Sequence, residues 1–172
     1  MRKMIDPENQ EPIEVQLALS RFQGLARKIK VRVLHKVAKV CHPSSLRILL
    51  HKARGVQIGE GVFIGEQVHL DDYAPELIKL ANGVRVAAQT IIMSHKRDIG
   101  GCYKKEMKAV EVPIKHFETI LEEDVQVGIR SIIMPGVRIG KGAIIGAGSL
   151  VTRDIPEYSL AIGVPAEVVK EF

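Results

Sequence analysis

A six-residue repeat in the C-terminal half of the chain constrains the fold more than any other feature. Every sixth residue from Leu121 to Val151 is aliphatic, and the residue four places on is mostly small or β-branched. A period of six fits neither an amphipathic helix nor an ordinary alternating strand. It predicts short strands that coil into a parallel β-helix. The expected inward-pointing residues are Leu121, Val127, Ile133, Ile139, Ile145 and Val151.

The same count extends upstream with two interruptions. Four extra residues near 74–77 break it once, and a charged stretch without the period, about residues 96–117, breaks it again. We expect the second stretch to be a loop that protrudes from the coil. The tail after Val151 carries two prolines and is expected to leave the coil and cover its open end. The upstream inward residues are Ile58, Ile64, Leu70, Leu80, Val86 and Ile92.

The N-terminal third has a different character. Residues 1–12 are polar and predict a loose arm. Between Ile13 and Arg54, ten residues are Lys or Arg and only Glu14 is acidic. Apolar residues at helical spacing from about residue 15 to Cys41 predict an amphipathic helix with a basic outer face, ended by Pro43. A second short helix over 46–53, capped by Ser44 or Ser45, should follow. We therefore divide the chain into a helical arm, 1–54, and a coil domain, 55–172.

Two interpretations of the basic helix 15–41 remain open. In the one we favour, its apolar stripe packs on the coil or on a sister subunit, and its charges face solvent. In the other, the helix lies on an anionic membrane. The two cysteines are far apart and the chain has no long apolar run, so a cytoplasmic location is expected, at the inner face of the membrane in the second interpretation.

One histidine occupies a position typical of a site. If three hexads form one turn, residues eighteen apart stack, and after allowing for the insertion His95 lies between Tyr73 and Gly136. All three positions are corners, and His95 opens the protruding loop. Imidazole titrates near neutral pH, which makes His95 a candidate catalytic residue. We favour surface positions for His69 and His116.

The coil sequence resembles the hexapeptide-repeat acyltransferases over roughly residues 55–170. The resemblance rests on IIMPGVRIGKGAIIGAGSLVTRDIP and AIGVPAEVV, and on the segment that ends in TIIMSH before the loop. It is greatest for O-acetyltransferases of the maltose, galactoside and nodulation type and their relatives in polysaccharide synthesis. It implies a left-handed coil, a homotrimer with active sites between subunits, acetyl-CoA as co-substrate, and no metal.

The resemblance also implies roles for particular residues. His95 would be the general base, and Asp71, Asp72 and Tyr73 would contact the acceptor. The two aspartates could also orient His95 or simply form a turn, as aspartate often does. The implied contacts to the coenzyme are Ile129 and Ala147 along the pantetheine arm, Thr152 and Arg153 after it, and Lys170 near the 3′-phosphate.

The expected function is therefore an acetyl-CoA-dependent O-acetyltransferase acting on a hydroxyl of a saccharide or polysaccharide precursor. Two alternatives stay open: N-acetylation of an amino-sugar nucleotide, and a non-catalytic trimeric scaffold. A γ-class carbonic anhydrase is disfavoured, because it needs zinc histidines close in sequence and His95 and His116 are 21 residues apart. No nucleic-acid partner is expected, since the basic residues include no aromatic stacking platform.

Overall fold

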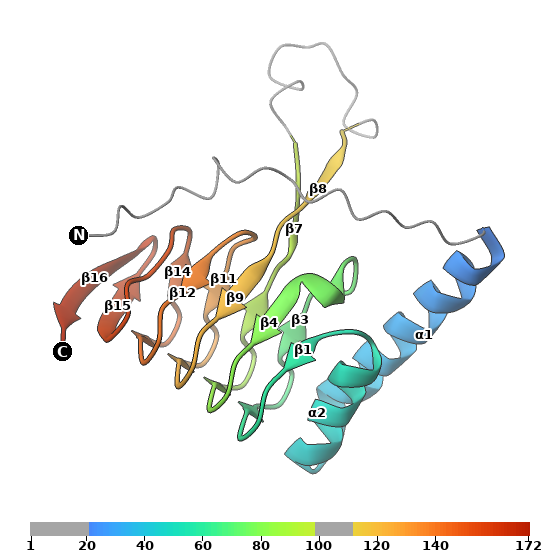
Figure 1. Ribbon diagram of the computed structural model, residues 1–172, viewed down its shortest axis with the longest axis horizontal. Coiled ribbons are helices and arrows are strands. Elements are labelled where there is room, and N and C mark those ends of the chain that lie inside the picture. The colour runs from blue at the N-terminus through green and yellow to red at the C-terminus, as the bar shows by residue number, and fades with distance from the viewer. Residues whose placement is uncertain (1–20, 99–111) are drawn as a thin grey trace.

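The computed structural model describes residues 21–98 and 112–172, with side chains from residue 29 onward. It is a three-sided coil of short strands with two helices at its N-terminal end, α1 (Arg21–Val40) and α2 (Ser44–Ala53) (Figure 1). The expected arm, the first residues of the expected helix and the tip of the expected loop, residues 99–111, lie outside the described residues.

The coil has three faces, and each face is a sheet whose strands are parallel except for β16 at the end of the second. The first contains β1 (Gln57–Ile58), β4 (Ile78–Leu80), β9 (Thr119–Leu121) and β12 (Arg138–Ile139). The second contains β2 (Phe63–Ile64), β5 (Arg85–Val86), β10 (Gln126–Val127), β13 (Ile144–Ile145), β15 (Ser159–Gly163) and β16 (Ala166–Glu171). The third contains β3 (His69–Leu70), β6 (Ile91–Ile92), β11 (Ile132–Ile133) and β14 (Leu150–Val151).

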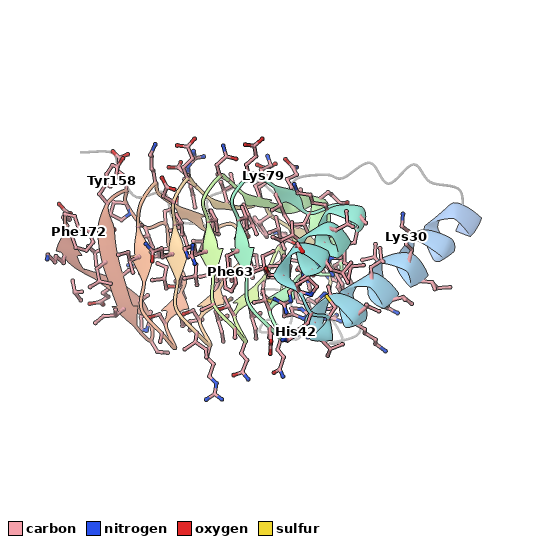
Figure 2. The ribbon with its side chains drawn as sticks, turned by 90° about the horizontal axis from the view of Figure 1, so that it is seen from below. Lys30, His42, Phe63, Lys79, Tyr158 and Phe172 are labelled. Atoms are coloured by element: carbon pink, nitrogen blue, oxygen red, sulfur yellow. The ribbon has the colours of Figure 1, made fainter. Side chains whose placement is uncertain are left out.

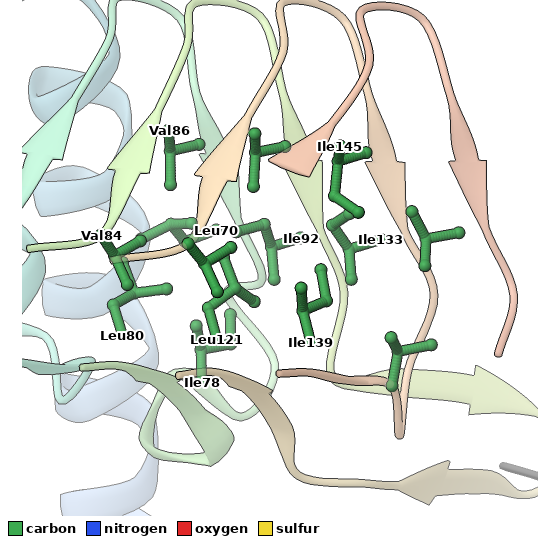
Figure 3. Packing of buried hydrophobic residues seen from close by; sticks show 14 of the residues in the cluster. Leu70, Ile78, Leu80, Val84, Val86, Ile92, Leu121, Ile133, Ile139 and Ile145 are labelled. Atoms are coloured by element: carbon green, nitrogen blue, oxygen red, sulfur yellow. The ribbon is translucent and has the colours of Figure 1, made fainter. Parts of the chain in front are cut away.

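The interior of the coil, which we call the prism core, follows the six-residue count. The aliphatic residue of each hexad is buried from Ile64 to Val151, and Ile58 is partly buried (Figure 3). The strands pair in the expected register, with Leu70 beside Ile92 and Ile92 beside Ile133. Because one aliphatic side chain per strand fills a narrow interior, the chain needs few aromatic residues.

The C-terminal tail differs from the prediction. It does not leave the coil after Val151: Ile155 bridges to Ile139, and β15 continues the second face by pairing with β13 in parallel. Two more buried side chains, Ile155 and Ala161, therefore extend the core beyond the predicted end. Only β16 departs from the coil, and it folds back antiparallel to β15.

The loop prediction is confirmed where the structure describes it. The chain leaves the coil after Ile92, and β7 (His95–Arg97) pairs antiparallel with β8 (Ile114–His116). The pair rises away from the three faces of the coil (Figure 1). The pairing places His95 directly opposite His116.

The two helices lie against the N-terminal end of the coil. As predicted, the first helix ends before His42-Pro43. The predicted serine cap of the second helix is wrong, since α2 begins at Ser44, its N-cap is Pro43, and no side chain caps it. The proposed domain boundary at residue 54 falls between α2 and β1. No helix in the described ranges combines the length and apolar character needed to cross a bilayer.

The outward face of α1 contradicts the favoured interpretation for packing on the coil. The stripe predicted from helical spacing includes Ile29, Val33, Val37 and Val40, and all four are exposed. A different face, with Val31, His35 and Ala38, is the buried one. The helix thus has two apolar faces, and among the described residues only one of them is covered.

The buried contact between the helices and the coil includes a cluster of polar side chains. Arg47 donates hydrogen bonds to the carbonyl oxygens of Ala38, Cys41 and Ile64. His35 lies 3.0 Å from His69, nitrogen to nitrogen, and the ring of His51 is fully buried beside them. We call this contact the helix–prism junction; its polar members are His35, Arg47, His51, Arg54 and His69.

Candidate active site

A carboxylate and an imidazole meet at one corner of the coil. Asp71 follows β3 and His95 begins β7, so both lie where the third face ends, one turn of the coil apart. The Nδ1 atom of His95 contacts Oδ2 of Asp71. Asp71 is almost fully buried, whereas 19% of the His95 side chain is exposed. The buried acid therefore holds a histidine that solvent and ligands can reach.

Backbone groups fix the position of the Asp71 carboxylate. Its Oδ1 accepts a hydrogen bond from the Tyr73 N–H at 2.9 Å, and its Oδ2 accepts one from the Ser94 N–H at 2.8 Å. Although burial raises the pKa of Asp71, these hydrogen bonds and His95 together hold that pKa below its ordinary value. The side chain is therefore a carboxylate at neutral pH, and it favours the His95 tautomer that carries its proton on Nδ1.

Two rings flank His95. The Tyr73 ring lies 4.4 Å from the His95 ring, centroid to centroid, as the stacking of corners eighteen residues apart predicts. The His116 ring lies 6.3 Å away on the opposite strand of the hairpin. Burial, followed by the nearby His95, lowers the pKa of His116. His116 is thus a neutral neighbour of His95. It is partly exposed, and it lies on β8 of the hairpin rather than in a loop.

A residue of the helix–prism junction also contacts the backbone of this corner. Arg54 donates hydrogen bonds through Nη2 to the carbonyl oxygens of Leu70 and Asp71. Burial lowers the pKa of Arg54 to about 10, which leaves it charged at neutral pH. His69, two residues before Asp71, is also in the junction and is half-buried rather than at the surface. Asp72 lies 4.0 Å from Arg32 of α1, so it faces the helix.

The five residues expected to contact coenzyme A are distributed over different parts of the coil. Ile129 and Ala147 share the corner between the second and third faces, where the Gly148 N–H donates to the Ile129 carbonyl. Thr152 and Arg153 follow β14 at the corner that carries His95. Lys170 lies on β16, where its ammonium group is 4.9 Å from the ring centre of Phe172.

The surroundings of these residues fit a phosphorylated, partly apolar ligand. Ile129 is 46% exposed, and the space around Gly148 is open. Arg153 and Lys170 are exposed cations. Ile129 and His95 lie on different corners of the chain. Their roles stay predictions.

A hollow of about 630 Å³ lies elsewhere, over the face that contains β1, β4, β9 and β12. It contains none of the predicted site residues. Several charged residues that line the hollow already form ion pairs. Arg138 pairs with Glu122 and Lys141 with Glu123, and Lys79 pairs with Glu118, which does not line the hollow. Within the described ranges, no group of three or more His, Cys, Asp or Glu side chains could hold a metal ion. The Asp71–His95 corner is therefore the better candidate for chemistry.

Comparison with known proteins agrees with the architecture. Residues 118–153 match the family model described as bacterial transferase hexapeptide (six repeats). These residues form a hexapeptide repeat. The predicted fold, a left-handed parallel β-helix with an N-terminal helical extension, is confirmed.

A curated relative of the hexapeptide coil is the 2,3,4,5-tetrahydropyridine-2,6-dicarboxylate N-acetyltransferase of Staphylococcus aureus. It is 48% identical over 52 residues, which are 30% of this chain and 22% of the relative. The aligned part thus spans about a fifth of the relative's length.

Solved structures cover more of the chain. A hexapeptide-repeat-containing acetyltransferase from Vibrio cholerae aligns with a TM-score of 0.72 and 20% identity over 90% of this chain and 94% of its own. A galactoside acetyltransferase in complex with coenzyme A aligns with a TM-score of 0.64 and 24% identity over 86% of this chain and 81% of its own. An N-acyltransferase from Bacillus cereus was solved in complex with dTDP-4-amino-4,6-dideoxyglucose and coenzyme A. It aligns with a TM-score of 0.58 and 28% identity over 67% of this chain and 63% of its own.

Proposed function

We propose that the chain is an acetyl-CoA-dependent O-acetyltransferase that modifies a hydroxyl of a saccharide, with His95 as general base. The observation that carries the proposal is the contact between buried Asp71 and accessible His95. The likeness to a galactoside acetyltransferase with bound coenzyme A supports the class of donor. The acyl thioester of the donor supplies the group to be transferred.

His95 has the arrangement that a general base needs. With its Nδ1 proton directed at the Asp71 carboxylate, its Nε2 lone pair is available to the acceptor. Nε2 takes the hydroxyl proton as the acceptor oxygen attacks the thioester carbonyl, and then returns it to the departing thiolate. Asp71 stabilises the imidazolium that forms between the two steps. Such proton transfer typically contributes about 10²–10⁴-fold to the rate.

Neighbouring residues have positioning roles in this proposal. The exposed ring of Tyr73, which lies against His95, offers a surface for a sugar ring. The apolar side chain of Ile129 suits a pantetheine arm, and the cations Arg153 and Lys170 suit its phosphates. The proposal includes a homotrimer with each site between two subunits, so that Ile129 of one subunit and His95 of another contact the same ligand.

N-acylation of an amino sugar is the second candidate. The 28% identity to the Bacillus cereus enzyme, which was solved with an amino-sugar nucleotide and coenzyme A, favours it. The same His95 would then take a proton from the attacking amine. Only the acceptor distinguishes the two reactions, so the test must include both kinds.

The test is thiol release from acetyl-CoA with panels of hydroxyl and amino saccharides. We expect turnover with one panel and a loss of about 10²–10⁴-fold in His95→Ala, with binding of coenzyme A retained. His42→Ala is the matched control, because His42 is an exposed histidine that pairs with Glu66 away from the site. Undiminished turnover in His95→Ala would refute the assigned base. Failure to bind coenzyme A would refute the donor.

A further inference from the structure

The outward stripe of α1 is an apolar surface that nothing in the described chain covers. The exposed fractions are 56% for Ile29, 53% for Val33, 44% for Val37 and 75% for Val40. At about 100° per residue these four side chains lie within a narrow sector of the helix, roughly opposite the buried Val31 and Ala38. Four β-branched side chains in one exposed row are more than the scattered apolar residues normal at a protein surface.

Basic residues border this stripe on both sides. By the same helical geometry Lys30 lies along one edge, and Arg32, Lys36 and Lys39 lie toward the other. No acidic residue occurs between Ile29 and Arg54. Arg32 lies near Asp72, and Lys39 is half-buried, which leaves Lys30 and Lys36 as the most open pair.

The stripe is also in an accessible place. Figure 2 shows α1 extending past the end of the coil, with Lys30 on the extended part and His42 back beside the coil. A flat surface could meet the extended helix without first meeting the three faces of the coil.

We propose that α1 docks this protein on an anionic membrane, with Ile29, Val33, Val37 and Val40 in the apolar boundary and Lys30 and Lys36 at the headgroups. An apolar row with basic edges is the arrangement expected of an interfacial helix, and long basic side chains can extend to the headgroups on either side. Charge favours a membrane over a second copy of the helix, because two such rows in contact would bring like charges together. The docking is independent of the proposed catalysis.

The experiment is sedimentation of the full chain with vesicles of phosphatidylcholine alone or mixed with phosphatidylglycerol, at low and high salt. We expect binding to the mixed vesicles that weakens with salt and is small with phosphatidylcholine alone. Lys30→Gln/Lys36→Gln should weaken binding about fivefold for each charge removed. Val33→Gln/Val37→Gln should weaken it further, because the apolar contact is lost.

Matched controls separate docking from general charge or stickiness. Arg85→Gln removes one exposed positive charge from the second face of the coil, and Val169→Gln removes an exposed valine from β16. Both controls should bind like the unmodified chain, and all variants should keep its thermal unfolding midpoint. The substituted residues are exposed, so folding should survive.

Three results would overturn the proposal. The first is no binding of the unmodified chain to mixed vesicles at low salt. The second is binding that the lysine variant loses and the valine variant keeps, since this would be adsorption without docking of the stripe. The third is self-association that Val33→Gln/Val37→Gln abolishes without vesicle binding, which would assign the stripe to a second copy.

Discussion

The prism core and the helix–prism junction are both buried, but their chemistry differs. The core is filled almost entirely by aliphatic side chains, one for each strand, and has no charge to gain or lose. The junction buries His35, Arg47, His51 and Arg54. The contribution of the core to stability should therefore hardly change with pH. The contribution of the junction should depend on the protonation state of its histidines and on its hydrogen bonds.

The largest effect is expected in the prism core. Ile133→Ala removes a fully buried side chain from the middle of the third face. We expect it to lower the free energy of unfolding by about 2–5 kcal/mol, because a cavity replaces packed methyl groups. Urea unfolding at pH 7 and pH 5 should give the same loss at both pH values. A loss that grows at pH 5 would contradict the contrast between the two regions.

The corners of the coil should be nearly as sensitive as its core. At Gly128 an added Cβ would lie 2.5 Å from the backbone nitrogen of Ala147 in the next turn. Gly128→Ala should therefore force adjacent turns apart and cost about 1–3 kcal/mol of unfolding free energy. Equilibrium urea unfolding measures this cost. Unchanged stability would show that the turns can separate freely.

Arg47 tests the hydrogen bonds of the junction. Arg47→Met keeps the length of the side chain but removes the donors to three buried or half-buried carbonyl groups. We expect a loss of about 1–3 kcal/mol, the cost of leaving such groups unsatisfied. Hydrogen exchange should show the loss concentrated in α1 and α2 while amides of the third face stay protected. Equal loss of protection throughout the chain would contradict the expectation that the two helices can separate from the coil while the coil stays folded.

The histidines of the junction should produce the smallest effect at neutral pH and a growing one in acid. Burial and the nearby Arg54 lower the pKa values of His35 and His51 to about 3, from an ordinary 6.5. Below about pH 6.5 these two histidines are therefore protonated in the unfolded chain, whereas in the folded chain they stay neutral down to about pH 3. Stability is full above pH 6.5 and falls as the pH drops between these limits.

His51→Leu tests this expectation. Both ring nitrogens of His51 lack a hydrogen-bond partner among the described residues, so an apolar side chain should be tolerated there. The variant should lose less stability than the unmodified chain between pH 7 and pH 5. Ile133→Val is the control, and it should follow the pH dependence of the unmodified chain. If His51→Leu loses as much stability between pH 7 and pH 5 as the unmodified chain, His51 does not cause the loss of stability in acid.

The sequence predicts the core far better than the junction, for a physical reason. Each aliphatic residue of a hexad has one possible destination, so the period alone places Leu121 or Ile145. The α1 sequence has apolar residues on two sides, and nothing in the periodicity indicates which side the coil covers. The prediction that the stripe with Val33 and Val37 packs on the coil is therefore wrong, while packing on a sister subunit is not tested by this chain alone.

The site was predictable to the same limited extent. Counting hexads brings Tyr73 beside His95, because both lie on the repeat. His116 lies off the repeat, and its pairing with His95 depends on the β7–β8 hairpin. The charged stretch between these strands gave no period from which to infer that pairing. A search for antiparallel partners on either side of the loop could have found it.

The most direct test of the central claim is a double-mutant cycle on Asp71 and His95, read as kcat for thiol release from acetyl-CoA. If Asp71 acts by holding His95, Asp71→Asn should lower kcat strongly, and Asp71→Asn/His95→Ala should be no slower than His95→Ala alone. Coenzyme A binding should be the same in all three variants. Losses that simply multiply in the double variant would show that the two residues act separately and would contradict the proposed site.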